Sequence, residues 1–360
     1  FSIKGMSLTS PIHASLLVLT TPIVITLLAA FFLKERLNSF FLLKDRLLDV
    51  NNEALIQAKA SAYNQNSWFL PDFIEKSITQ IAQQFLTKEA LLDWTAAYPQ
   101  IADKMTHKKV GIVMAGNIPL VGFHDLLSTL IAGHTAVVKL SSKDTVGMEY
   151  IIHTLIEIEP QWKDHIIVQS HLKDCDAYIA TGNNNTSRYF EQYFGKYPHI
   201  IRSNKTSIAI LDGGESAADL NLLADDMMLY FGRGCRNVTQ VWVPEGYDFV
   251  PLLNALKKYN YIIDEHKYRH NYDYQLALLM MTRQFYMDTN AILLSENPSP
   301  FAAIAQIHYQ FYTPTRPPIA NPAEIQCVVG KGGLTFGSLQ KPSLQQYADG
   351  VDTLSFLTGL

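Results

Sequence analysis

The sequence predicts an α/β fold built on a mostly parallel sheet, and two observations carry this prediction. Short apolar runs alternate with helix-like segments through the middle of the chain. Strands that alternate with helices in this way form a mostly parallel sheet covered on both faces. The chain has 360 residues, 48% of them hydrophobic, which suffices for about two domains with their own cores.

From Leu37 to Trp94, apolar residues at three- and four-residue spacing predict covering helices, one of which begins at Pro71. After Lys109, the segments VGIVMAG, LVGFHDLLSTLIAG and TAVVKLSS predict a strand–helix–strand unit. The runs HIIVQS, DAYIATG and SIAILDG predict further strands, and TSRYFEQYFGKY predicts a helix.

A second α/β region is predicted from Ala217 onward. The helix ADLNLLADDMMLYF, the strand VTQVWVP and the helix FVPLLNALKKY follow one another. Residues 297–321 are rich in proline and aromatic residues, and we expect a loop there. The apolar runs IQCVVG and TLSFL predict strands that close the chain.

The N-terminal segment 14–33 carries no charged residue, and as a helix of about 30 Å it matches a bilayer core. It predicts a transmembrane helix, and the cations Lys34 and Arg36 indicate a cytoplasmic end. A buried helix of a soluble fold is the alternative. The sequence SLTSPIHASLLVLTTPIVITLLAAFFLKERL resembles a helix of the EamA-type drug/metabolite transporters.

This resemblance implies a gene fusion or an assembly join near Leu37, with membrane contact through residues 11–36. Because the chain begins at Phe1 rather than at methionine, we expect an upstream part to be missing.

Charge and cysteine content exclude several classes of protein. Lys and Arg number 29 and Asp and Glu 33, so the formal net charge of −4 excludes the basic surface of a nucleic-acid binder. Cys175, Cys235 and Cys327 are too few and too dispersed for a disulfide framework or a zinc site, which indicates a reducing compartment. His266 and His270 lack a third ligand, and we predict no metal site.

Cys235 in YFGRGCRNV is the predicted nucleophile. Its neighbouring glycines let the backbone approach a ligand, and the guanidinium groups of Arg233 and Arg236 would favour thiolate over thiol. Charged neighbours are unusual for a thiol that only fills a core. We expect Cys175 and Cys327, by contrast, to be buried filler.

A thiol that attacks an acyl carbonyl needs hydrogen-bond donors for the oxyanion. Asn117 in AGNIPLVG follows a strand and precedes Pro119, which places it at the carboxyl edge of the sheet, where ligands bind in open α/β folds. Asn117 is therefore the candidate donor, with a helix cap or turn residue as the alternative. Gly116 beside it is a candidate cofactor contact.

Two further strand ends are candidate cofactor contacts. Lys139 and Ser141 end one strand, where a cation can meet a ribose or its 2′-phosphate. Thr181 and Gly182 end another, before a helix whose N-terminus could face phosphate. No G-x-G-x-x-G follows any strand, so spacing leaves the cofactor open and ordinary turn chemistry remains the alternative.

Four blocks together resemble the LuxC-type acyl-CoA reductases, a branch of the aldehyde dehydrogenase superfamily, from about Leu37 to the C-terminus. They are GNIPLVGFHDLLSTLIAGHTAVVKLSSKD, DAYIATGNNNTSRYF, YFGRGCRNVTQVWVPEGYD and YADGVDTLSFL. The resemblance implies an aldehyde-dehydrogenase-like fold with a Rossmann-like cofactor domain and a second α/β catalytic domain. The expected division is residues 1–36 as the hydrophobic helix, 37–212 as the cofactor domain with its N-terminal helices, 213–345 as the thiol domain and 346–360 as a C-terminal segment.

By this resemblance, Cys235 takes the acyl group and Asn117 binds the oxyanion, while Lys139 meets the adenosine ribose and Gly182 lies over the cofactor. The implied reaction is NADPH-dependent reduction of a long-chain acyl thioester to the aldehyde, with acyl-CoA or acyl-protein as donor and NADH as the alternative cofactor. We expect a cytoplasmic catalytic part and a homo-oligomer.

One departure from the superfamily favours reduction over hydrolysis. Hydrolytic aldehyde dehydrogenases carry a glutamate base in the stretch that corresponds to HIIRSNKTSIAIL, and no acidic residue lies between His199 and Lys205. Without a base to activate water, an acyl-enzyme persists until hydride reaches it. The competing interpretations are an oxidising or CoA-acylating dehydrogenase and a non-catalytic, membrane-tethered remnant of a transporter fusion.

Overall fold

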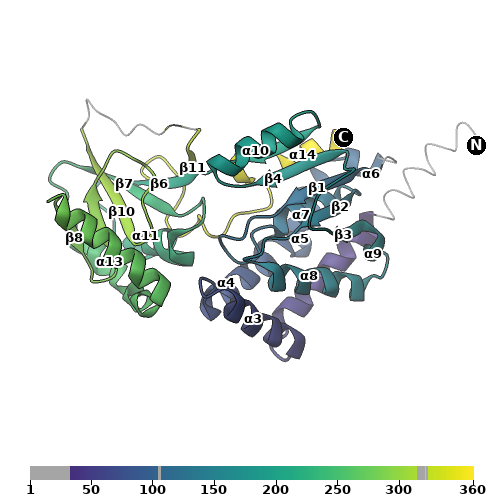
Figure 1. The fold of residues 1–360 in the computed structure, drawn as a ribbon, viewed down its shortest axis with the longest axis horizontal. Coiled ribbons are helices and arrows are strands. Elements are labelled where there is room, and N and C mark those ends of the chain that lie inside the picture. The colour runs from purple at the N-terminus through teal and green to yellow at the C-terminus, as the bar shows by residue number, and fades with distance from the viewer. Residues whose placement is uncertain (1–32, 104–106, 314–320, 322) are drawn as a thin grey trace, which may run out of the picture.

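The computed structural model describes residues 33–103, 107–313, 321 and 323–360 (Figure 1). The predicted transmembrane segment lies outside the described residues except for Leu33. Within the described ranges, no helix combines the length and the apolar character needed to cross a membrane.

The first sheet is fully parallel, with the strand order β3-β2-β1-β4-β5. Its strands are β1 (Lys109–Val113), β2 (Thr135–Lys139), β3 (Ile166–Val168), β4 (Ala177–Thr181) and β5 (His199–Arg202). The predicted strand–helix–strand unit is confirmed, because α7 (Phe123–Ile131) connects β1 to β2. The order of the strands places β2, β1 and β4 side by side, so their carboxyl ends share one edge.

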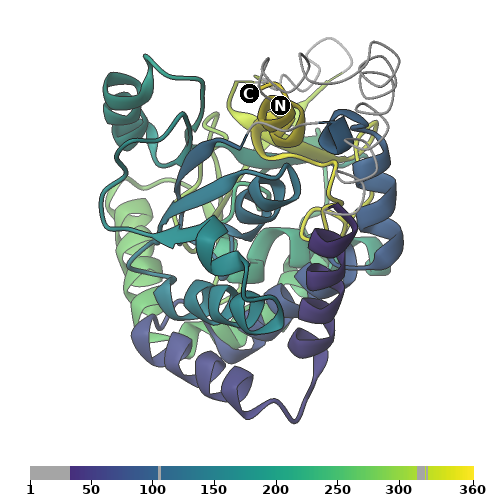
Figure 2. The ribbon, with the colours of Figure 1, turned by 90° about the vertical axis from the view of Figure 1, so that its right-hand side faces the viewer.

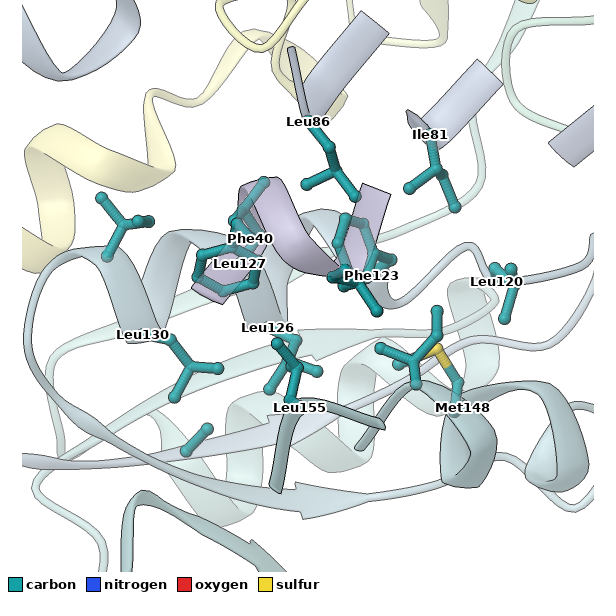
Figure 3. Close-up of a cluster of buried hydrophobic side chains, with 14 of the residues drawn as sticks. Phe40, Ile81, Leu86, Leu120, Phe123, Leu126, Leu127, Leu130, Met148 and Leu155 are labelled. Carbon is teal, nitrogen blue, oxygen red and sulfur yellow. The ribbon is translucent and has the colours of Figure 1, made fainter. Parts of the chain in front are cut away.

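Helices cover this sheet (Figures 1 and 2). They are a helix over residues 33–48, α3 (Glu53–Gln65), α4 (Pro71–Gln80), the π-helix η1 (Ile81–Phe85), α5 (Lys88–Ala96), α6 (Gln100–Asp103), α8 (Thr145–Ile158), α9 (Trp162–His165) and α10 (Asn184–Phe194). Pro71 begins α4 as predicted, because its missing N–H costs nothing at the first helical position. Figure 3 shows the core, in which Phe40 lies beside Leu127 of α7 and Leu155 lies beside Leu126.

The second sheet has the strand order β11-β6-β7-β10-β9-β8, and all its pairs are parallel except β8 with β9. Its strands are β6 (Thr206–Ile210), β7 (Val238–Pro244), β8 (Tyr286–Asp288), β9 (Leu293–Glu296), β10 (Gln306–Tyr312) and β11 (Ile325–Gly330). Its helices are α11 (Ala217–Met228), η2 (Leu229–Gly232), α12 (Val250–Leu256), η3 (Lys257–Asp264) and α13 (His266–Met281). This half lies at the left of Figure 1.

Three details differ from the sequence-based expectations. β6 pairs with β7 and β11, so the boundary between the sheets follows β5 and does not lie at residue 212. β10 lies inside 297–321, where a loop was predicted, because its alternating aromatic residues fit a strand. The run predicted as a closing strand is the helix α14 (Thr353–Thr358), because a short apolar run fits the period of a strand or of a helix. The Asp352 side chain caps this helix by accepting from Ser355 N at 2.8 Å.

The C-terminal segment returns from the second sheet to the first half of the molecule. After the short helix η4 (Ala348–Gly350), α14 packs beside α7, and Leu354 and Leu357 join the first core. The indole Nε1 of Trp94 donates to the hydroxyl of Tyr347 at 2.7 Å. Figure 1 shows this yellow segment beside the first sheet, so the segment ties the two halves together.

Candidate active site

The loops that follow β1 and β2 are in direct contact at the carboxyl edge of the first sheet. A Cβ atom on Gly116 would lie 2.3 Å from Ser141 Oγ, which is far inside van der Waals contact. Only glycine therefore fits at this position without moving the neighbouring loop. Two of the predicted cofactor residues are thus brought together. Lys139 lies exposed at the end of β2 and forms no ion pair with any described residue.

The end of β4 completes this edge. Gly182 N donates to the carbonyl oxygen of Arg202 at 3.1 Å, which ties β4 to β5. Asn183 then caps α10, because its Oδ1 accepts from Thr186 N at 2.8 Å. Thr181 and Gly182 therefore lie directly before a helix N-terminus, as predicted, with the partial positive charge that such an end carries.

Cys235 lies in the loop between η2 and β7. Tyr230 and Phe231 both have a φ of 58° and Gly232 has a φ of 70°, so three consecutive left-handed residues turn the chain out of α11. The hydroxyl of Ser207 in β6 donates to the carbonyl oxygen of Cys235 at 3.1 Å. Cys235, the predicted nucleophile, is thus held against the second sheet.

Asn117 reaches this loop from the first half of the molecule. Its Nδ2 donates to the carbonyl oxygen of Arg233 at 2.9 Å, two residues before Cys235. A side-chain amide carries two N–H groups, so this bond fixes the amide plane and uses only one of them. The structure therefore places the predicted oxyanion donor against the loop that carries the predicted nucleophile, 118 residues away in sequence.

The electrostatics of the thiol differ from the prediction that two arginines favour its charged form. Burial raises the pKa of the Cys235 thiol, and the positive charge of Arg236 opposes this shift without overcoming it. Arg233 does not serve the thiol, because its guanidinium lies 4.5 Å from the ring centroid of Trp68. Arg236 Nη1 donates instead to Cys327 Sγ at 3.4 Å.

A buried ion pair that local sequence patterns did not indicate lies at the end of β5. Arg202 Nη1 lies 2.7 Å from Asp125 Oδ2 of α7, and Nη2 donates to Thr353 Oγ1 of α14 at 2.9 Å. Nη1 also contacts Thr181 Oγ1 at 3.4 Å, and the Arg202 charge lowers the pKa of the Cys235 thiol slightly. The sequence did contain two signals of this pair: Arg202 ends an apolar strand, and Asp125 is the only acidic residue in the apolar helix α7.

A carboxyl group from the C-terminal segment also enters the site. Asp349 lies close enough to Cys235 for its negative charge to raise the pKa of the thiol. Burial raises the pKa of Asp349 itself, while Lys205 and Arg202 act in the opposite direction. Asp349 belongs to the block YADGVDTLSFL, but the spacing of residues in the sequence did not predict that it would lie near Cys235.

The other two thiols have different surroundings. Cys175 is buried in a small cluster with Val137 and Tyr178, whereas Cys327 on β11 contacts Arg236. Among residues 33–103, 107–313, 321 and 323–360, no group of three His, Cys, Asp or Glu side chains could hold a metal ion.

Solved structures with a similar fold include aldehyde dehydrogenases. An enzyme of this kind from Physcomitrella patens has a TM-score of 0.60 at 12% identity, over 79% of this chain and 69% of its own. A putative aldehyde dehydrogenase from Burkholderia cenocepacia has a TM-score of 0.58 at 13% identity, over 78% of this chain and 70% of its own. The fold is therefore aldehyde-dehydrogenase-like.

Residues 52–251 match the family model described as acyl-CoA reductase (LuxC), and the chain belongs to this family. A curated relative, long-chain acyl-protein thioester reductase 2 of Photobacterium leiognathi, is 22% identical over 192 residues. That alignment spans 48% of this chain and 40% of the relative.

Proposed function

We propose that this protein reduces a fatty acyl thioester to the aldehyde through an acyl-enzyme on Cys235. The observation that carries this proposal is the bond from Asn117 to the Arg233 carbonyl oxygen at 2.9 Å, which holds an uncharged amide against the loop that carries the thiol. Membership of the LuxC family and the name of the curated relative support the same reaction.

In the first step, the thiol of Cys235 loses its proton and its sulfur bonds to the acyl carbon. The bond from that carbon to the donor sulfur breaks, and the donor leaves as a free thiol with the proton. The second N–H of Asn117 and the backbone N–H of Cys235 are the donors for the transient oxyanion. Because burial raises the pKa of the thiol, we expect the thiol to lose its proton only when the acyl donor is bound. The negative charge then passes directly to the oxygen of the bound carbonyl.

The carboxyl edge of the first sheet fits a dinucleotide. The closely packed Gly116 and Ser141 loops, Thr181 and Gly182 before the α10 N-terminus, and the exposed Lys139 are the groups that would hold it. A reduced nicotinamide, when bound, supplies the hydride for the acyl carbon. We propose NADPH rather than NADH, because the exposed cation of Lys139 suits a 2′-phosphate.

The fate of the acyl group follows from the residues around it. No acidic residue lies between His199 and Lys205, so that stretch offers no base for water. The Asp349 carboxyl is engaged by the Ser203 backbone N–H and lies beside Lys205. Aldehyde rather than carboxylic acid is therefore the proposed product.

Intact-protein mass spectrometry of the full chain tests this proposal. Mixing with a long-chain acyl-CoA should add one acyl mass, and NADPH should remove it and release aldehyde. Cys235→Ala should abolish both the adduct and turnover while leaving NADPH binding intact, whereas the matched variant Cys175→Ala should retain both. Turnover by Cys235→Ala, or carboxylic acid as the main product, would overturn the assignment.

The donor and the assembly are proposals of the same kind. Acyl-protein and acyl-CoA thioesters share the reacting group, so comparing acyl transfer from both separates them. Membrane contact through residues 11–36 and a homo-oligomeric state stay predictions, which vesicle flotation and light scattering of the full chain test.

A further inference from the structure

A second asparagine, Asn237, forms a hydrogen bond with the same peptide unit as Asn117, the one between Arg233 and Gly234. Asn237 Oδ1 accepts from the N–H of Gly234 at 2.8 Å, while Asn117 Nδ2 donates to the carbonyl oxygen of Arg233 at 2.9 Å. That N–H and that carbonyl belong to one peptide unit, which immediately precedes the Gly234–Cys235 bond. Two side chains from the two halves of the molecule thus fix this peptide at both of its polar ends.

The rest of the Asn237 side chain is anchored in a rigid element. Its Nδ2 donates to the carbonyl oxygens of Asp226 and Leu229 at 3.0 and 2.9 Å, at the end of α11. Asn237 is fully buried, so water cannot replace these bonds. The left-handed pair Tyr230 and Phe231 lies between the two ends that Asn237 joins, and its anchored amide therefore spans the turn that leads to the thiol.

The contact leaves no freedom at Gly234. A Cβ atom there would lie 2.9 Å from Asn237 Oδ1, so any side chain would displace the amide. From these contacts we infer that Asn237 is a positioning residue for the acyl transfer, resting on the proposed function. It fixes the peptide before Cys235 and hence the direction of the Cys235 sulfur and backbone N–H relative to Asn117.

Acylation and alkylation of the thiol separate this role from a purely structural one. 4-Nitrophenyl acetate acylates a thiol through an oxyanion and reports the reaction whatever the natural donor is, while iodoacetamide alkylates a thiol without an oxyanion. In Asn237→Ala we expect the plateau rate of acylation at high pH to fall about tenfold to a hundredfold. The rate of alkylation should change by less than about threefold, because alkylation needs no aligned amide.

The matched control is Asn260→Ala. The Asn260 amide also bridges two elements, through the carbonyl oxygen and hydroxyl of Thr289, but it lies outside the thiol loop. It should lower the melting temperature without changing the ratio of acylation to alkylation.

Gly234→Ala gives a second test that keeps Asn237 and should show the same selective loss, which matters if Asn237→Ala does not fold. Unchanged acylation in a folded Asn237→Ala or Gly234→Ala, or an equal loss in Asn260→Ala, would overturn the inference. If wild-type protein reacts with 4-nitrophenyl acetate but not with acyl-CoA or acyl-protein, the proposed function fails and the inference about Asn237 is still tested.

Discussion

Asp144 gives the sharpest quantitative prediction, because its carboxyl group is almost fully buried and burial, not a neighbouring charge, shifts its pKa. It is 3% exposed, and its Oδ2 accepts from Leu120 N at 2.7 Å in the loop that follows Asn117. Asp144 lines a small cavity together with mostly apolar side chains from α3, α4 and α8, including Leu55, Ile78 and Ile151. Burial raises the pKa of this group from 3.8 to about 8.

The sign of the effect on stability follows from linkage. The folded state holds the proton up to about pH 8, whereas the unfolded chain releases it near pH 3.8. The stabilising contribution is therefore complete below about pH 4 and is lost as the pH rises toward 8. The slope is about 1.4 kcal/mol per pH unit, so about 3 kcal/mol is lost between about pH 5 and pH 7.

Asp144→Asn removes this titration and keeps an acceptor for Leu120 N. The difference in free energy of unfolding between variant and wild type, measured with urea, should shift in favour of the variant by about 3 kcal/mol between about pH 5 and pH 7. Asp248→Asn is the matched control, because its exposed carboxyl accepts from Val250 N at 2.9 Å. A difference for Asp144→Asn that stays constant over this range would refute the argument.

Three further predictions concern the edge of the first sheet. Arg202→Met should lower the free energy of unfolding, measured with urea, by about 3–5 kcal/mol, because it leaves the buried Asp125 carboxylate without its cation. Adding Asp125→Leu should restore most of this free energy, and no recovery would contradict the pairing. Gly116→Ala should cost about 1–3 kcal/mol, and Ser141→Gly should relieve it because the added methyl would strike Ser141 Oγ. Lys139→Met should raise the Kd for NADPH roughly fivefold in a fluorescence titration and leave that for NADH nearly unchanged, whereas equal changes would argue against a 2′-phosphate contact.

Local sequence patterns predicted the first half of the fold well. The apolar runs at β1 and β2 and the helix between them were found at their observed places, because strand and helix periods are properties of consecutive residues. The same reasoning misplaced the closing run at α14, whose six residues are too few to separate the two periods. It also missed β10, because the proline-rich surroundings of residues 297–321 outweighed its alternating pattern.

The sequence also predicted one part of the candidate site and not the other. Glycine spacing and the charged neighbours of Cys235 pointed to a reactive thiol, and residues at strand ends pointed to a ligand edge, since a parallel sheet brings such ends together. The environment of the thiol was not legible: the sequence suggested two helpful arginines, whereas the structure turns Arg233 onto Trp68 and buries the sulfur.

The sequence by itself determined the α/β class, the order of most elements, and the residue types capable of nucleophilic and oxyanion chemistry. Only the tertiary structure decided which of them meet: Arg202 with Asp125 across 77 residues, and Asn117 with Arg233 across 116. Contacts at such separations depend on how whole helices and sheets pack, and burial then sets the pKa of each group. Neither the long-range contacts nor the pKa values can be predicted from any short stretch of the chain.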